Sequence, residues 1–185
     1  MQSPTFRSIA MLFLLASCSG SPDTDSKATM RTPAAGQPPP PLSIELMGAR
    51  PSWTNAQYVG HAFMCISVPT NVGPREDCLG FYPSPTADKA YIGGPGVTSS
   101  EFQQAPGRFS LVTVSLRRTI TADQRTAIYR MMDDWNRRQY RLLDSSCIDF
   151  VASVAQTIGM ATPPRIATEL PEAYLRRLKT ANTGT

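Results

Sequence analysis

A tract rich in serine, threonine, glycine and proline, from residue 18 to residue 41, most limits where this chain can fold. It ends in the run GQPPPP and holds few side chains that could bury apolar surface. Such a composition cannot offset the conformational entropy lost on folding, so we predict a disordered tether that stiffens toward its prolines. The folded domain is therefore expected over residues 42–185, roughly 140 residues, which is enough for one hydrophobic core.

The segment before this tract has the pattern of an export signal. Arg7 supplies a positive charge, and residues 9–15 form a short apolar run. A run of this length is too short to span a membrane as a helix, whereas it is typical of a secretion signal. Residues 1–17 are therefore predicted to be a signal peptide.

The sequence LASC at residues 15–18 resembles the lipobox of bacterial lipoproteins. That resemblance implies cleavage before Cys18, followed by attachment of lipid to this cysteine, and several acyl chains anchor a protein stably to a membrane. Ser19 follows, rather than an aspartate, which in such lipoproteins indicates the outer membrane, facing the periplasm, in a cell that has one. The alternative is an ordinary signal peptide with an incidental cysteine.

The chain has a net charge of +4, and its basic residues gather after Arg108. This bias would favour an anionic envelope or membrane surface, although solvated helix faces show the same pattern. No nucleic-acid-binding motif accompanies the arginines, so nucleic acid is not predicted as a partner.

The first part of the domain has the patterns of β-strands. Residues 57–68 and 78–82 are rich in β-branched and aromatic side chains and predict a hairpin. Residues 108–120 alternate apolar and polar side chains, which predicts another strand. The Gly- and Pro-rich stretch 83–100 is expected to be a loop.

Helices are predicted after residue 120. The first, over residues 121–140, starts with a capping box formed by Thr121 and Gln124. A second is expected over residues 147–158 and ends before a glycine, and a third over residues 171–180 starts with a proline. The expected fold class is therefore α+β, with a small antiparallel sheet packed against helices.

Four cysteines are present, and Cys18 is assigned to the lipid. In an oxidising compartment the remaining odd number leaves at least one thiol unpaired within the chain. Cys65 and Cys78 lie on the two strands of the predicted hairpin, so a disulfide forms if the register places them opposite each other. Cys147 would then be the free thiol. No CxxC motif or Cys/His cluster occurs, so no metal site is predicted.

Cys147 is predicted to open a helix, with Ser145 or Ser146 as the cap. The free N–H groups and the helix dipole at such a position favour the thiolate over the thiol. His61, the one histidine of the chain, is the available base for a nucleophilic cysteine. Asp149 fits the capping box better than a catalytic role. Each residue alone also has a structural interpretation, Cys147 as a small buried hydrophobe and His61 as a hydrogen-bonded strand residue.

The motif GHAF at residues 60–63, followed far downstream by the pattern YRLLxxSCxDF at residues 140–150, resembles the circularly permuted NlpC/P60 branch of papain-like thiol hydrolases. The resemblance implies a permuted papain-like fold in which the histidine precedes the cysteine. It also implies Cys147 as the nucleophile, His61 as its base, and no cofactor. Members of this family act on amide, ester or thioester bonds, including those of peptidoglycan peptides and lipids.

The same resemblance implies a third polar residue that orients the histidine from the next strand. Tyr82 is our candidate, because it lies across from His61 in the predicted hairpin, and it ranks ahead of Glu76 and Asp77 nearer the turn. One departure from the family is Ser146, which stands where the motif often has an asparagine.

The sequence therefore predicts an envelope-anchored cysteine hydrolase, with an amide bond in a peptidoglycan peptide as the first choice of substrate. Cys147 would attack, His61 would transfer protons and Tyr82 would orient the imidazole. Ester or thioester hydrolysis, or acyl transfer on lipid substrates, is the second candidate. The alternative from a different class is a non-catalytic lipoprotein that binds envelope components or a partner protein.

Overall fold

A computed structural model of the protein describes residues 41–52, 59–84 and 93–183. The predicted signal peptide, Cys18 and the tether up to residue 40 lie outside this part of the chain. The described part has an α+β fold with a six-stranded antiparallel sheet, in agreement with the fold class expected from the sequence.

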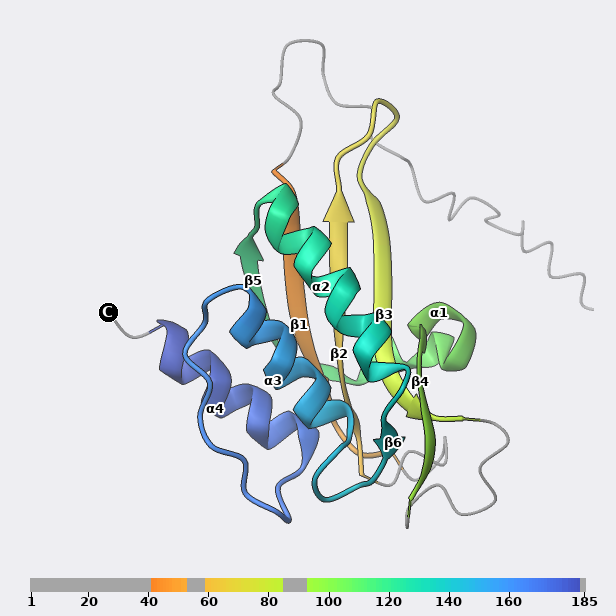
Figure 1. The fold of residues 1–185 in the computed structure, drawn as a ribbon. Helices are drawn as coiled ribbons and strands as arrows, with labels where there is room; N and C mark the ends of the chain where they lie inside the picture. Colours follow the sequence, from red (N-terminus) through yellow and green to blue (C-terminus); the bar gives the residue numbers. More distant parts are fainter. Residues whose placement is uncertain (1–40, 53–58, 85–92, 184–185) are drawn as a thin grey trace, which may run out of the picture. The chain divides into compact units, whose positions relative to one another are not determined.

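The strands are β1 (Ser43–Ala49), β2 (His61–Val68), β3 (Arg75–Pro83), β4 (Gly94–Ser100), β5 (Val112–Thr119) and β6 (Gln139–Tyr140). The helices are α1 (Glu101–Gln104), α2 (Ala122–Trp135), α3 (Cys147–Thr157) and α4 (Pro171–Thr183), and a 3-10 helix, η1 (Pro106–Leu111), precedes β5. The strand order in the sheet is β5-β1-β2-β3-β4-β6 (Figure 1).

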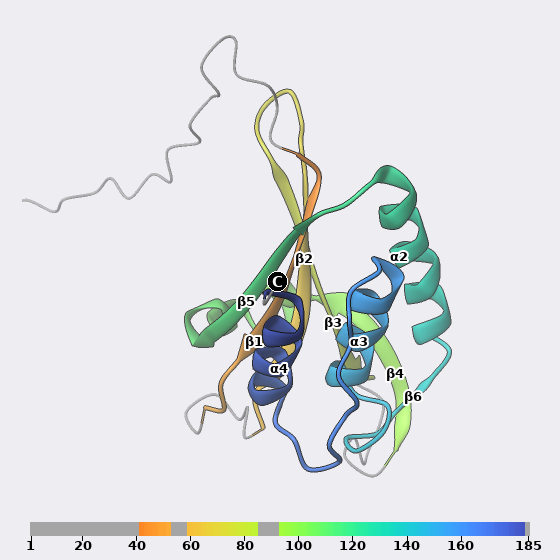
Figure 2. The ribbon, with the colours of Figure 1, turned by 90° about the vertical axis from the view of Figure 1, so that its left-hand side faces the viewer.

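The sheet has helices on both sides. Helices α2, α3 and α4 lie in front of it in Figure 1, with α3 packed on β2 and α4 on β1. Alternate residues of β2 enter the core beneath these helices, namely Ala62, Met64 and Ile66. Phe63 and Cys65 instead pack with Leu111 of η1 in a smaller cluster, on the side opposite α2 and α3 (Figure 2). Strand β2 is therefore buried on both faces, which explains the apolar run from Ala62 to Ile66.

Both predicted capping boxes are confirmed. Thr121 accepts from the backbone of Gln124 at the start of α2, and Ser146 and Asp149 form the second box at the start of α3. Helix α2 ends at Trp135, so the prediction of helix through residue 140 was wrong at its end. The chain leaves the helix for the sheet there, because the Asn136 side chain accepts hydrogen bonds from Thr98 of β4.

Strand β4 corrects the prediction that residues 83–100 form a loop. Its sequence GPGVTSS has low strand propensity, but residues 96–100 pair with β3, and Gly94 and Pro95 pair with β6. A Cβ atom at Gly96 would lie 2.0 Å from the Phe81 ring, so glycine is needed here for close packing. Strand β1 was also missed by the sequence analysis.

The predicted strand over residues 108–120 begins later than expected. Residues up to Leu111 form η1, and the strand itself is Val112–Thr119.

The predicted hairpin is present, with β2 beginning at His61 and β3 extending from Arg75 to Pro83. Its register places Cys65 directly opposite Cys78, and the two form a disulfide. Cys147 is therefore the free thiol of the described residues.

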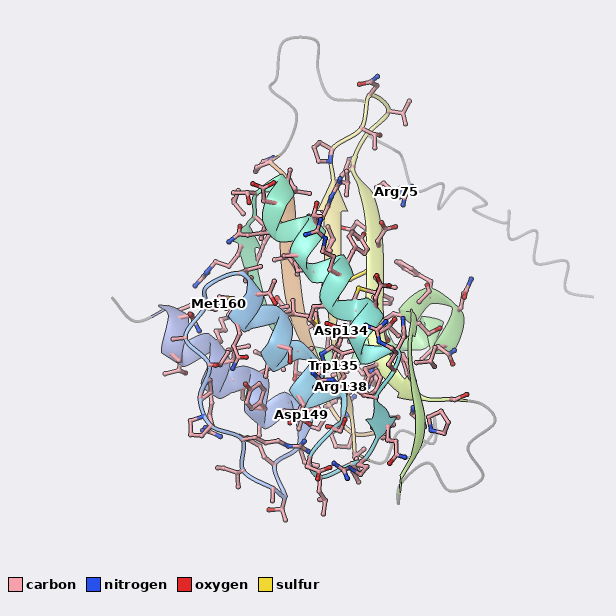
Figure 3. The ribbon with its side chains drawn as sticks, viewed as in Figure 1. Arg75, Asp134, Trp135, Arg138, Asp149 and Met160 are labelled. Carbon is pink, nitrogen blue, oxygen red and sulfur yellow. A yellow bond between two sulfur atoms is a disulfide. The ribbon has the colours of Figure 1, made fainter. Side chains whose placement is uncertain are left out.

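Trp135 anchors α2 to the sheet. Its ring lies edge-on to Phe81 of β3 at 4.8 Å and to Phe150 of α3 at 5.6 Å, measured between centroids. The guanidinium of Arg138 covers the outer face of the ring at 4.5 Å (Figure 3). Trp135 is only 1% exposed, so it joins both helices and the sheet into one core.

Replacing Trp135 by alanine is expected to lower the free energy of unfolding by about 3–5 kcal/mol, because a large buried side chain is lost and a cavity remains. Urea denaturation followed by circular dichroism measures this change. Val72→Ala is the control, since Val72 is 80% exposed, and it should change stability by less than about 0.5 kcal/mol. Equal stability of the two variants would contradict this account of the core.

Candidate active site

His61 is the first residue of β2 and is only 5% exposed. The chain enters this strand through Gly60, whose φ of 74° and close approach to the Ala49 carbonyl exclude a side chain. The imidazole stacks on the Tyr82 ring at 4.6 Å between centroids. The ring of His61 is thus held by packing from the neighbouring strand β3.

Cys147 is the first residue of α3, where the chain turns into the helix. Ser146 caps the helix, and its own backbone N–H donates to Asp149 at 2.8 Å. Asp149, labelled in Figure 3, also forms an ion pair with Arg165. Asp149 therefore acts as a capping residue, as the sequence predicted, and fixes the helix start that carries the thiol.

Cys147 and His61 lie within hydrogen-bonding contact of each other. Burial alone would raise the pKa of Cys147, but the charge and hydrogen bond of His61 outweigh burial and lower it. The backbone N–H of Ala62 and the charge of Arg165 lower the Cys147 pKa further. The site therefore favours a thiolate, the form of cysteine that acts as a nucleophile.

The pKa of His61 is shifted in the complementary direction. Burial would lower it, but Cys147 and Glu101 together raise it above the ordinary value. The thiolate of Cys147 exists above its lowered pKa, and the imidazolium of His61 exists below its raised pKa. Both shifts widen the pH range over which a thiolate–imidazolium pair is populated, as in activated cysteines.

Glu101 is the direct hydrogen-bond partner of the histidine. His61 Nε2 lies 3.1 Å from Glu101 Oε1, which leaves Nδ1 as the ring nitrogen available to Cys147. The Glu101 carboxylate also accepts from the Tyr82 hydroxyl and, at 2.7 Å, from Arg108. Burial raises the pKa of Glu101, but these partners outweigh burial and keep the carboxylate ionised. A buried carboxylate with several donors orients the imidazole and stabilises its charged form.

Gly80 makes room for this hydrogen bond. It lies on β3 opposite Phe63, and a Cβ atom there would lie 2.1 Å from Glu101 Oε1 and 2.5 Å from His61 Nε2. No side chain fits at these distances without displacing the two groups. The glycine is therefore part of the site, although it carries no functional group.

The structure brings His61, Cys147 and Tyr82 together, as expected from the sequence. Tyr82 contacts the face of the imidazole and hydrogen-bonds to Glu101, so it supports the orienting residue. Burial and then the Glu101 charge raise the pKa of Tyr82, so its hydroxyl stays protonated. Glu76 and Asp77 lie farther along β3, toward the hairpin turn, where they pair with Ser67 and Ile66 of β2. They are therefore not part of the site around His61.

Sequence reasoning missed Glu101 and Arg108. Glu101 follows Ser99 and Ser100, which is an ordinary pattern for an exposed helix start, and nothing local indicates that its side chain is fully buried. Arg108 was assigned to a strand. Only the pairing of β3 with β4 brings Glu101 to His61, and these two residues are forty positions apart in the chain.

A pocket of about 110 Å³ lies beside the thiol and is partly open to solvent. Cys147, which is only 3% exposed, and Ser146 are among the residues that line it. Most of its wall is apolar and comes from the loops that flank α3. The pocket is therefore a candidate binding site for a small substrate group beside Cys147.

The described residues contain neither a metal-binding cluster nor a membrane-spanning helix. Across residues 41–52, 59–84 and 93–183, no group of His, Cys, Asp and Glu side chains is arranged to hold a metal ion. Within the same ranges, no helix has both the length and the apolar character needed to cross a bilayer.

The fold and the site define an α+β protein with a buried cysteine–histidine–glutamate cluster. Comparisons with known protein families, with curated proteins and with solved structures found no match.

The ion pair predicts how the reactivity of Cys147 depends on pH. The rate of alkylation by iodoacetamide should rise as pH passes the lowered pKa of Cys147, below the range of an ordinary thiol. In His61→Ala the rise should move to higher pH, because burial then acts without the opposing imidazolium. Mass spectrometry of the alkylated peptide measures both profiles. Coincident profiles would contradict the ion pair.

Gly80→Ala should separate His61 from Glu101. The added methyl group overlaps both side chains, so the pKa of His61 should fall and the alkylation profile of Cys147 should move to higher pH. Overpacking should also lower the free energy of unfolding by about 1–3 kcal/mol. Gly107→Ala is the matched control, since a Cβ at Gly107 has nothing within 4 Å. The same profile in both variants would contradict the role given to Gly80.

Proposed function

We propose that this protein is a cysteine hydrolase that cleaves an amide bond through an acyl-enzyme thioester. The observation that carries the proposal is the contact between Cys147 and His61, which lowers the pKa of the thiol and raises that of the imidazole. A buried cysteine that served only for packing would keep a raised pKa. The pocket on the thiol gives a substrate carbonyl access to the sulfur.

The chemistry follows from the positions of these groups. The Cys147 thiolate attacks the carbonyl carbon. The Ser146 side chain already accepts from the first-turn N–H groups of Ile148 and Asp149, so the backbone N–H of Cys147 is the group that stabilises the charge developing on oxygen. The His61 imidazolium then protonates the leaving amine. Water, deprotonated by His61, releases the acid and restores the thiolate. Glu101 is a positioning residue that holds the imidazole through Nε2.

We further propose that the fold is the permuted papain-like fold. The support is that His61 opens a strand, that Cys147 opens a later helix, and that this helix packs on that strand. Ser146, in place of the asparagine often found in the family motif, supplies a helix cap.

The proposed location is the bacterial envelope, with the protein anchored by lipid on Cys18 and a peptidoglycan peptide as its first substrate. Two observations support export. The lipobox-like sequence at residues 15–18 is one, and the Cys65–Cys78 disulfide is the other, because such bonds persist in oxidising compartments.

Ester or thioester hydrolysis, or acyl transfer on lipid substrates, is the second candidate. The same thiolate and imidazolium serve these reactions, and the apolar wall of the pocket favours them. A non-catalytic envelope-binding protein is the alternative, and it predicts no covalent intermediate on Cys147.

The test is to incubate the purified protein with peptidoglycan fragments and with a thioester, and to detect released amine or thiol together with an acyl adduct on Cys147 by mass spectrometry. Cys147→Ala should abolish both turnover and adduct. His61→Ala should slow turnover by about 10²–10⁴-fold, because general acid–base catalysis contributes about that much.

Arg137→Ala is the control, since this arginine is exposed, and its turnover should equal that of the unchanged protein. Turnover that persists in Cys147→Ala, or no adduct with any substrate, would favour the binding protein.

A further inference from the structure

The pocket beside Cys147 differs in chemistry from the rest of the site. Its apolar lining comes from Val59, Leu142, Leu143, Ile148, Leu170 and Pro171. Leu143 and Leu170 are 60% and 43% exposed, so large apolar side chains stand at its open side. Exposed apolar surface that borders a concave site is typical of ligand binding.

The charged residues in the wall of the pocket already have partners. Arg165 is bound to Asp149 and to the Leu142 carbonyl. Glu169 accepts at 2.9 Å and 3.0 Å from Arg177. The buried Nε of Arg165 has no hydrogen-bond partner among the described residues, but the charge of this arginine is already paired with Asp149. A charged substrate group that entered the pocket would therefore lose its water without gaining an unpaired counter-charge, which is unfavourable.

The pocket also lies on a defined side of the thiol. Cys147 and the residues on either side of it line the pocket, whereas His61 does not. The leaving group must lie toward His61, because this residue protonates it. The acyl group of the substrate, which stays on the sulfur, is then directed toward the pocket.

We infer that this pocket binds the acyl side of the substrate and selects an apolar acyl group. The inference rests on the proposed hydrolase function. An apolar cavity of about 150 Å³ holds one benzene ring, so a pocket of about 110 Å³ suits a short alkyl chain or an apolar amino-acid side chain. A longer chain would extend past Leu143 and Leu170 toward solvent.

A matched pair of substrates tests the inference. 4-Nitrophenyl butyrate and 4-nitrophenyl hemisuccinate differ at the end of the acyl chain, where one has a methyl group and the other a carboxylate. The butyrate is expected to react at least about 10-fold faster in kcat/KM, since a single methylene in an apolar pocket contributes about that much. 4-Nitrophenyl esters of hexanoate and of N-acetyl-leucine then show whether the pocket prefers a fatty acyl group or a peptide acyl group. A higher kcat/KM than that of the hemisuccinate with either ester supports an apolar acyl pocket.

Leu170→Lys is the informative variant. It should slow the butyrate and speed the hemisuccinate, which reverses or removes the preference. Ile166→Lys is the control, because Ile166 is 55% exposed on the same loop and does not line the pocket. Iodoacetamide should still alkylate Cys147 in both variants, which shows that the nucleophile is intact.

The two proposals fail in different ways. If no ester forms an adduct on Cys147, the hydrolase function itself is wrong. If adducts form at equal rates from butyrate and hemisuccinate, or if Leu170→Lys keeps the preference of the unchanged protein, the hydrolase function stands and the apolar acyl pocket is wrong.

Discussion

One buried carboxylate organises the site. Glu101 has no exposed surface, and an ionised group in that position is tolerated only when donors surround it. His61, Tyr82 and Arg108 are these donors. They come from β2, β3 and η1, so satisfying one charge fixes three segments relative to each other. The absence of a side chain at Gly80 is part of the same constraint, because a Cβ atom there would overlap the hydrogen bond that His61 donates to Glu101.

The pKa of the Cys147 thiol depends on Glu101 indirectly, through His61. Glu101 raises the pKa of His61, and the charged imidazole lowers the pKa of Cys147 against the effect of burial. The Ala62 amide and Arg165 act on the same sulfur from other directions. Cys147 also lines a pocket that is partly open to solvent. This combination distinguishes the site from a cysteine that only fills space in a core.

The parts of the fold that were predictable have local causes. Capping boxes at Thr121 and Ser146 use side chains within three positions of each other, so they can be read directly from the chain. Strand β4 could not be predicted, because the glycine at position 96 is explained only by the approach of the Phe81 ring from another strand. The end of α2 likewise depends on the hydrogen bonds between Asn136 and Thr98.

The sequence by itself determined that Cys147 opens a capped helix, that the chain has one histidine, and that the remaining cysteines are odd in number. These properties belong to residue types and short spacings. Tertiary structure alone decided that Cys65 faces Cys78, that His61 contacts Cys147, and that Glu101 holds the imidazole. The physical reason is that a disulfide forms only when the strand register places its cysteines opposite each other, and a buried carboxylate is stable only when several elements supply hydrogen-bond donors. Strand register and distant donors leave no pattern in the residues next to the cysteine or the glutamate.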